Sequence, residues 1–195
     1  MHVITTETQK KIIDAFFMVA SNYPNKKITV EMVGQQAGMS RENIYHNHFR
    51  GIKEIIEKIH FLVDEELYNK FQRFVYDENT NLLNFLTHHV LPFLYEKREW
   101  LKILYGTQID PEWEYFLESR YTPLINTYLD KIGKKDIIPN FFLSQIFVKE
   151  FMAIVSVWLT DNNPEPPSLF IKKFIYILNQ SPTDMLENKK SPNLI

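Results

Sequence analysis

The stretch from Ile28 to Lys58 constrains this chain most, because it carries a glycine-containing turn between two short segments with apolar residues at helical spacing. Thr29 can cap the first of these segments as a helix. Its apolar positions Val30, Val33 and Ala37 recur at three- and four-residue intervals, which places them on one face. A short helix with one buried face is therefore expected.

The residues that follow predict a sharp corner and a second helix. Gly38 permits the positive φ at which a helix commonly stops, and Ser40 can cap a new helix that runs through Ile44. Gly34 lies four residues before Gly38, where two closely crossing helices leave room only for a small side chain. This order predicts a helix-turn-helix, and a bulky residue at Gly34 should splay its two helices.

Polar side chains occupy the free side of the second helix: Arg41, Glu42, Asn43, His46 and His48. Such a set can form hydrogen bonds with phosphates and base edges, so it is typical of a DNA-reading helix. The alternative is a solvated polar face. Charge favours DNA only mildly, because residues 1–60 hold eight Lys or Arg against six Asp or Glu and the remainder holds 14 against 18. The local placement of polar residues therefore carries the prediction.

A preceding segment completes a three-helix unit. Residues 8–21 carry a broad apolar stripe that can cover the helix pair from behind, formed by Ile12, Ile13, Phe16, Phe17, Val19 and Ala20. Residues 22–25 break this helix. Lys26 and Lys27 follow just before the Thr29 cap, and they either belong to a solvated loop or make flanking contacts to phosphates.

These residues, in this order, resemble the TetR family of bacterial one-component transcriptional regulators. The resemblance is carried by the string ITVEMVGQQAGMSRENIY and the amphipathic helix after it, with typical positions matched by Thr29, Val30, Gly34, Ala37, Gly38, Met39, Ser40, Tyr45, His48, Phe49 and Lys53. The chain departs from the family pattern at three places. Gly34 replaces the usual Ala, one extra residue separates Tyr45 from Phe49, and Ile52 stands where a phosphate-binding Lys is common, with Lys53 adjacent.

The resemblance implies an all-α fold in two parts and a tail. An N-terminal three-helix helix-turn-helix DNA-binding domain would span residues 1–50, a larger helical effector-binding and dimerisation domain residues 51–180, and a C-terminal tail residues 181–195. The implied phosphate contacts are Thr29, Ser40, Tyr45 and Lys53, and the implied contacts to base edges are Arg41, Glu42, Asn43 and His46. Tyr45 has an alternative role in packing beside Ile44, and His48 is expected to cap or pack.

The rest of the chain reads as packed helices, since 45% of its residues are hydrophobic and only five are glycine. From Gly51 to Phe74 the apolar residues keep a helical rhythm, which predicts one long helix joining the two domains. A tilt or slide of this helix could move the DNA-reading helix. Pro92 should bend or end a later helix, Pro123 should kink another, and residues 181–195 should form a frayed tail.

Two apolar segments near the C-terminus predict self-association. Residues 141–159 carry hydrophobic side chains nearly all round a helix, which must then be covered on two sides. Residues 169–178 form a second apolar helix after a Pro-rich break. Pairing both with their copies in a second chain makes a four-helix interface, so a homodimer is expected. Two reading helices about 34 Å apart could then bind a palindromic operator in double-stranded DNA.

Aromatic residues of the second domain are the candidates for an effector site. They could line a cavity for a small molecule of apolar or aromatic character: Phe85, His89, Phe93, Trp100, Tyr105, Trp113, Phe116, Tyr121, Phe147 and Phe151. Aromatic stripes are more often plain core, which is the alternative for each of them. The bends expected at Pro92 and Pro123 favour a gap, because bent helices pack imperfectly.

Several classes of function find no support in the sequence. It has no cysteine, which excludes disulfides, thiolate catalysis and Cys-based zinc sites. The N-terminus has no apolar core of signal-peptide length and polar residues interrupt residues 141–159, so we expect a cytoplasmic protein without a membrane partner. We find no Gly-rich phosphate loop, HExxH or Ser-His-Asp order, so we expect neither an enzyme nor a cofactor. His88 and His89 point about 100° apart on a helix and do not predict a metal site.

We therefore predict a DNA-binding transcriptional regulator, a ligand-responsive repressor that binds a palindromic operator as a homodimer. Two alternatives stay open. In the first, a protein partner replaces the small molecule and the regulator acts as an activator. In the second, the chain is a helical module that binds apolar ligands, and its DNA-binding unit is vestigial.

Overall fold

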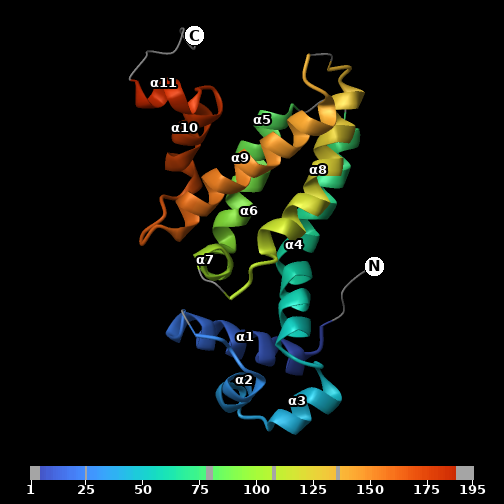
Figure 1. Cartoon of the computed structure of the whole chain (residues 1–195), viewed down its shortest axis with the longest axis vertical. Helices are drawn as coiled ribbons and strands as arrows, with labels where there is room; N and C mark the ends of the chain where they lie inside the picture. The colour runs from blue at the N-terminus through green and yellow to red at the C-terminus, as the bar shows by residue number, and fades with distance from the viewer. Residues whose placement is uncertain (1–4, 25, 78–80, 107–108, 135–136, 188–195) are drawn as a thin grey trace.

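In the computed structural model of the chain, the described residues are 5–24, 26–77, 81–106, 109–134 and 137–187. All regular secondary structure within these ranges is helical, which confirms the all-α prediction. Figure 1 shows the N-terminal helices at one end of an elongated molecule and a larger helical body at the other, with one long helix running between them.

Three helices form what we call the head: α1 (Glu7–Asn22), α2 (Val30–Ala37) and α3 (Arg41–Asn47). α1 packs against α2, and α2 against α3. The predicted apolar stripe of α1 is buried, with Ile12 and Phe16 fully enclosed. The side chains buried between these three helices therefore form a small core that holds α2 and α3 in place.

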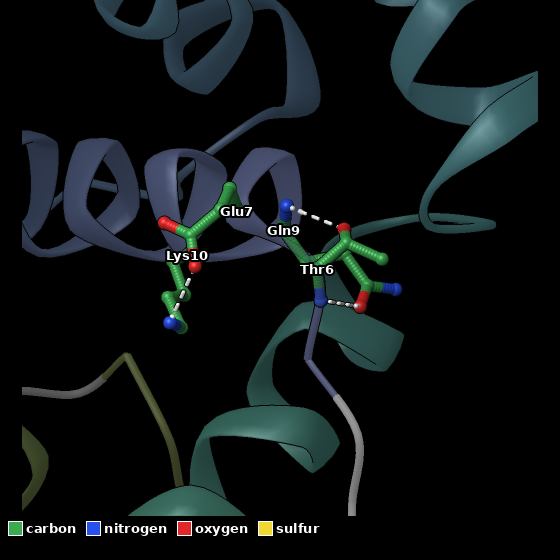
Figure 2. A network of polar contacts seen from close by, with 4 residues as sticks. All are labelled: Thr6, Glu7, Gln9 and Lys10. Carbon is green, nitrogen blue, oxygen red and sulfur yellow. Dashed lines mark hydrogen bonds and ion pairs between the residues drawn. The ribbon is translucent and has the colours of Figure 1, made fainter.

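The first helix begins with a reciprocal cap that sequence reasoning did not identify. The backbone N–H of Gln9 donates to Thr6 Oγ1 at 3.1 Å, and the Thr6 N–H donates to Gln9 Oε1 at 3.2 Å, as Figure 2 shows. An exposed ion pair between Lys10 and Glu7 lies on the same turn at 2.7 Å. Two N–H groups that a helix start leaves unpaired are thereby satisfied, so α1 begins at Glu7, one residue before the predicted start.

The corner between α2 and α3 has the predicted glycine geometry. Gly38 adopts a left-handed conformation, with φ 65°, at the end of α2. An added Cβ at Gly34 would lie only 2.8 Å from the backbone oxygen of Met39, closer than real Cβ contacts allow. The two helices therefore cross so tightly that Gly34 leaves no room for a side chain.

The long helix α4 (Ile52–Tyr76) covers 25 residues and confirms the prediction of one continuous helix from Gly51 to Phe74. It runs from the head into the body, where it packs along α8 (Trp113–Lys131) (Figure 1). Its apolar positions are buried along its length, from Ile55 near the head to Phe74 in the body. α4 is thus a rigid covalent link between the two regions.

The other body elements follow in chain order: α5 (Leu82–Phe85), the π-helical turn η1 (Leu86–Val90), α6 (Leu91–Glu96), α7 (Arg98–Gly106), α9 (Asn140–Thr160), α10 (Pro167–Leu178) and α11 (Pro182–Leu186). α9 packs against both α8 and α7, and α10 packs against α6. α7 lies directly above α1, so it is a second contact between body and head (Figure 1).

Pro92 does not end its helix, contrary to one of the two expected outcomes. The chain stays helical from Leu82 to Glu96, and the turn before the proline widens into the π-helical segment η1. There the N–H of Leu91 donates to the oxygen of Leu86, five residues back. The wider turn accommodates a residue that has no N–H and whose ring crowds the preceding turn. Pro123 likewise lies inside the continuous helix α8.

Helix α9 is the most apolar element and is covered on one side only. Val148, Met152 and Val155 are buried, whereas Phe142, Ile146 and Val157 on the other side are 54%, 45% and 76% exposed. By length and composition alone, α9 is the one helix among the described residues that could cross a membrane. Its exposed stripe leaves apolar surface that this single chain does not bury.

The expected frayed tail contains more order than predicted. Ser181 caps a short helix, α11, because its hydroxyl oxygen accepts a hydrogen bond from the Asp184 N–H at 3.0 Å. Pro182 stands at the first helical position, where its missing N–H costs nothing. Residues 188–195 of the predicted tail lie outside the described residues.

Candidate functional site

The free face of α3 presents the side chains that sequence analysis selected for base contacts. Ile44 is fully buried against the head, while Arg41, Glu42, Asn43 and His46 are all exposed. Because Ile44 anchors the helix by one face, the polar residues on the other faces point away from the core. α3 thus displays donors and acceptors on a helix short enough to enter a DNA groove.

A groove beside α3 brings other predicted residues together. Its lining includes Lys26, Lys27, Thr29, Arg41 and Tyr45. We call these five residues the basic groove, since three of them are cations and the groove lining holds one acidic side chain, Glu31. The two lysines precede α2 and the arginine opens α3, so residues from different parts of the head meet on one surface. A concave cationic surface of this kind fits a phosphate backbone.

Thr29 and Ser40, the two predicted cap residues, each accept a backbone hydrogen bond and remain exposed. Thr29 Oγ1 accepts a hydrogen bond from the Met32 N–H at 3.2 Å, and Ser40 Oγ accepts one from the Asn43 N–H at 3.1 Å. Each hydroxyl still has its own hydrogen to donate. Either residue can therefore cap its helix and contact a phosphate at the same time.

Two contacts hold the polar face of α3 in place. The guanidinium of Arg41 lies over the ring of Tyr45, one helical turn away, at 5.3 Å from the ring centre. The Asn47 side-chain amide donates to Asn43 Oδ1 at 2.8 Å. Tyr45 is 37% exposed, so the predicted packing role and a hydroxyl contact to phosphate are compatible.

Lys53 and His48 lie at the margin of this surface. Lys53 is exposed on the first turn of α4 and forms a loose ion pair with Glu57 at 3.8 Å. His48 is half-buried at the end of α3, where its backbone N–H donates to the oxygen of Ile44. Lys53 is therefore exposed and only loosely paired, so its side chain can reach a phosphate. His48 is the residue at which α3 ends.

The body contains an apolar cavity of about 60 Å³. Five of the ten predicted effector residues line it: Tyr105, Trp113, Tyr121, Phe147 and Phe151. Residues of α4, η1 and α6 complete the wall, so the cavity lies between six helical elements, these three and α7, α8 and α9. The sequence prediction named none of the α4 residues in this wall, and whether the cavity binds an effector stays a prediction.

The other five predicted effector residues do not line this cavity. Trp100 stacks on Phe17 of the head with ring centres 4.4 Å apart, and Phe85 stacks on Phe74 at 4.3 Å. The remaining three are Phe93 beneath the Lys70 ammonium, Phe116 against His60, and an exposed His89. Trp100 instead joins the body to the head, a role that periodicity could not reveal.

Sequence reasoning missed a buried polar network between α4 and α8. The Asp64 carboxylate accepts hydrogen bonds from Arg120 Nε and from the Tyr121 hydroxyl, both at 2.6 Å. On the preceding turn of α4, the imidazole of His60 is hydrogen-bonded to the buried carboxylate of Asp110. His60 and Asp64 are four residues apart and each follows an apolar stripe residue of α4. That spacing was the available signal for buried polar residues.

Burial dominates the electrostatics around the cavity. It raises the pKa of the Asp64 carboxyl, and the hydrogen bond from Tyr121 and the charge of Arg120 oppose that rise. It also raises the pKa of the Tyr105 hydroxyl, with partial opposition from the nearby Trp113 indole. Burial and the neighbouring Asp64 carboxylate raise the pKa of Tyr121 well above 10.0. Both tyrosines are therefore neutral donors at physiological pH.

No group of three or more His, Cys, Asp or Glu side chains among the described residues could hold a metal ion. His88 and His89 both lie on the exposed side of η1. His88 Nδ1 is instead within hydrogen-bond distance of the Asn84 backbone oxygen, at 3.0 Å. His88 is thus paired with the backbone of its own helical segment.

Comparison with known proteins adds a family and a fold. Residues 80–180 match the family TetR_C_8, described as "Transcriptional regulator C-terminal region". Among solved structures, one titled "Dihydroxyacetone kinase operon activator DhaS" is similar with a TM-score of 0.52 and 16% sequence identity, over 96% of this chain and 100% of that one. No curated protein sequence matches. The structural likeness extends over head and body alike, and at this identity it concerns the fold.

Proposed function

We propose a function from the premise that this chain belongs to the TetR family of transcriptional regulators. It acts as a ligand-responsive repressor that binds a palindromic operator as a homodimer. One observation carries the proposal: the exposed polar face of α3 stands beside the basic groove. A helix that displays donors next to a cationic groove can read bases while its surroundings hold the phosphates.

The contacts divide between base edges and phosphates. Arg41, Glu42, Asn43 and His46 contact base edges, because they project from the helix that enters the major groove. Thr29, Ser40, Tyr45 and Lys53 contact phosphates, and the two lysines of the basic groove, Lys26 and Lys27, add to them. The phosphate contacts fix the register of the head on the duplex, and the base contacts select the sequence.

A pair of variants tests this division on operators selected from random duplexes. Arg41→Ala should cost about 1–3 kcal/mol at one base position and relax the preference there. Lys27→Ala should weaken all sequences alike and lower the slope of log affinity against log salt by about 1. An Arg41→Ala loss that is uniform across sequences would remove Arg41 from the base-reading set.

The homodimer is proposed from the exposed apolar stripes of α9 and α10. Val157 and Ile146 of α9 and Leu169 and Tyr176 of α10 are each at least 45% exposed. Two helices from each of two chains can bury such stripes as a four-helix interface. That covers the apolar side of α9 within a water-soluble assembly and makes membrane insertion unnecessary. We place the protein in the cytoplasm, where its operator is.

A charge placed on this stripe tests the interface. Val157→Lys should convert the dimer to monomers at micromolar concentration, because it buries a cation without a partner. Tyr115→Lys is the matched control, since Tyr115 of α8 is 70% exposed and lies outside the two helices. Analytical ultracentrifugation distinguishes the two, and an unchanged dimer in Val157→Lys would remove α9 from the interface.

Regulation is proposed to act through the two links between body and head. A ligand in the body that favours one placement of α4 and α7 changes the distance between the two copies of α3. It can do so only by binding one arrangement more tightly, and tenfold release from the operator needs about 1.4 kcal/mol of coupling. Operator binding measured with and without candidate effectors tests this step.

A second candidate is an activator controlled by a protein partner. It is favoured by the name of the structurally similar protein, an operon activator, and by the small volume of the cavity, about 60 Å³. In vitro transcription from a promoter that carries the selected operator separates the two. Repression by the protein alone supports the first candidate, and stimulation that requires an added cell extract supports the second.

A further inference from the structure

The body cavity has one feature that an ordinary packing gap lacks. Trp113 is 2% exposed, and its buried indole Nε1 has no acceptor at hydrogen-bond geometry among the described residues, although the Tyr105 hydroxyl lies near enough for the indole to lower its pKa. Trp158 is buried to a similar degree, yet its Nε1 donates to the Glu165 backbone oxygen at 2.9 Å. Leaving a buried donor unpaired is costly, so such groups commonly await an unseen acceptor. Trp113 also lines the cavity, which gives that acceptor a place.

The remaining wall defines what kind of molecule fits. Its surface is almost entirely apolar, with aliphatic side chains such as Leu67, Leu101 and Ile125. The one carboxylate in the wall, Asp64, already has Arg120 and Tyr121 as partners. A charged ligand would lose its hydration and gain no free opposite charge, so a neutral molecule is favoured.

The volume limits the size of that molecule. A water needs about 10–15 Å³ of comparable volume, and a dry cavity of about 150 Å³ takes benzene. The cavity of about 60 Å³ therefore lies between one water and an aromatic ring. Molecules of roughly four or five non-hydrogen atoms are in this range.

We propose that the cavity binds a small neutral compound with a short apolar chain and a single carbonyl or ether oxygen, which accepts a hydrogen bond from Trp113 Nε1. This inference rests on the proposed function, because it names the effector class of the regulator. The position of the cavity explains how occupancy reaches the head. Leu101 and Tyr105 of α7 line it, while Trp100 of the same helix stacks on Phe17 of α1. The π-helical turn η1 also contributes Leu86 and Val90 to the wall.

The test uses the full chain, 2-butanone as the probe with an acceptor, and xenon as the apolar probe without one. The indole N–H signals of the three tryptophans are followed by NMR, and Trp113→Phe assigns the Trp113 signal. We expect 2-butanone to shift the Trp113 signal downfield and saturably at concentrations on the order of millimolar, as suits so small a ligand. The Trp158 signal should not follow it, since that donor is already paired.

Trp113→Phe is also the binding variant, because it removes the donor and keeps an aromatic ring. It should weaken 2-butanone roughly tenfold, the worth of one buried hydrogen bond, and should leave xenon binding intact. No saturable shift with 2-butanone, or equal affinity in Trp113→Phe, would overturn the inference. Operator binding is read on the same samples. Intact operator binding without a ketone signal counts against this inference alone, and a ketone signal without operator binding counts against the proposed function alone.

Discussion

The head and the body of this molecule are packed in opposite ways. In the head, one added carbon at Gly34 would meet the Met39 backbone oxygen at 2.8 Å. In the body, a cavity remains between α4, η1, α6, α7, α8 and α9, and the buried indole N–H of Trp113 has no acceptor at hydrogen-bond geometry among the described residues. Tight packing in the head fixes the angle at which α3 is displayed. Looser packing in the body would let it adopt a second arrangement when a ligand fills the cavity. The difference suggests that recognition resides in the rigid part and control in the part that can change.

The largest expected effect concerns the polar network between α4 and α8, whose Asp64 is 3% exposed. Asp64→Ala leaves the Arg120 guanidinium and the Tyr121 hydroxyl without their acceptor. Breaking one side of a buried ion pair costs about 3–5 kcal/mol. We expect the lower end of that range in urea unfolding, because the Arg120 side chain is 21% exposed.

Glu118→Ala is the matched control for that experiment. It breaks the ion pair with Lys149, at 2.5 Å, on the surface of the same body. The side chains of Glu118 and Lys149 are 28% and 58% exposed, against 2% for Asp64. Surface pairs contribute about 0–1 kcal/mol, so the unfolding curve of Glu118→Ala should lie close to that of the wild type. Equal losses in the two variants would mean that the network is not stabilising in the way its burial suggests.

Alkaline pH should weaken the body through its buried tyrosines. Burial raises the pKa of Tyr105 and Tyr121 above the ordinary value of 10.0, so above that pH the folded state binds more protons than the unfolded chain. Stability therefore falls as pH rises beyond about 10, by about 1.4 kcal/mol per pH unit for each group. Urea unfolding between about pH 9 and pH 11 measures the slope. Tyr105→Phe should have a shallower slope than the wild type, and an identical slope would contradict the burial of this hydroxyl.

A methyl group at Gly34, at the corner between α2 and α3, should have a smaller effect on stability. Gly34→Ala gains about 1 kcal/mol of helix propensity, but it forces the Met39 backbone to move. Overpacking of this kind costs about 1–3 kcal/mol, so a net loss of about 1 kcal/mol is expected. The melting temperature and the operator affinity should both fall, whereas Gln35→Ala at the exposed neighbouring position should lower neither. Because the usual residue here is Ala in the family that the head resembles, a stabilised Gly34→Ala would show that this corner is no tighter than theirs.

The smallest expected effect lies at the contact where the two regions meet. A double-mutant cycle with Phe17→Leu and Trp100→Leu should give a coupling energy of about 0.5–1.5 kcal/mol, as expected of stacked aromatic rings. The ring centres are 4.4 Å apart with an interplanar angle of 18°. A coupling near zero would mean that the stacked rings do not help to hold α7 against α1.

The head could be predicted closely from the sequence because local rules determine it. Thr29 and Ser40 cap the helices that they were expected to cap, and Gly38 has the positive φ that ends α2. Each of these depends on residues within four positions. The exposure of Arg41 and His46 then follows from the burial of Ile44. Their contacts with DNA stay a prediction.

The body could be predicted less closely because its features depend on residues far apart. The lengths of α4 and α9 follow from periodicity, but the partners of Asp64 lie 56 and 57 positions away. Trp100 and Trp113 look alike as aromatic residues near the start of a helix, yet one packs on the head and the other lines the cavity. The π-helical turn before Pro92 likewise reflects how α5 and α6 must pack around a residue without an N–H.

The central claim is that two copies of α3, held at a fixed separation by a dimer of bodies, read two half-sites on one face of the DNA. The most direct test measures affinity for the selected palindromic operator and for the same operator with about five base pairs, half a helical turn, inserted at its centre. The account predicts that the five-base-pair insertion lowers affinity to that of a single half-site. An insertion of about ten base pairs returns both half-sites to the same face of the duplex but leaves them farther apart than in the original operator. Unchanged affinity after the five-base-pair insertion would contradict it.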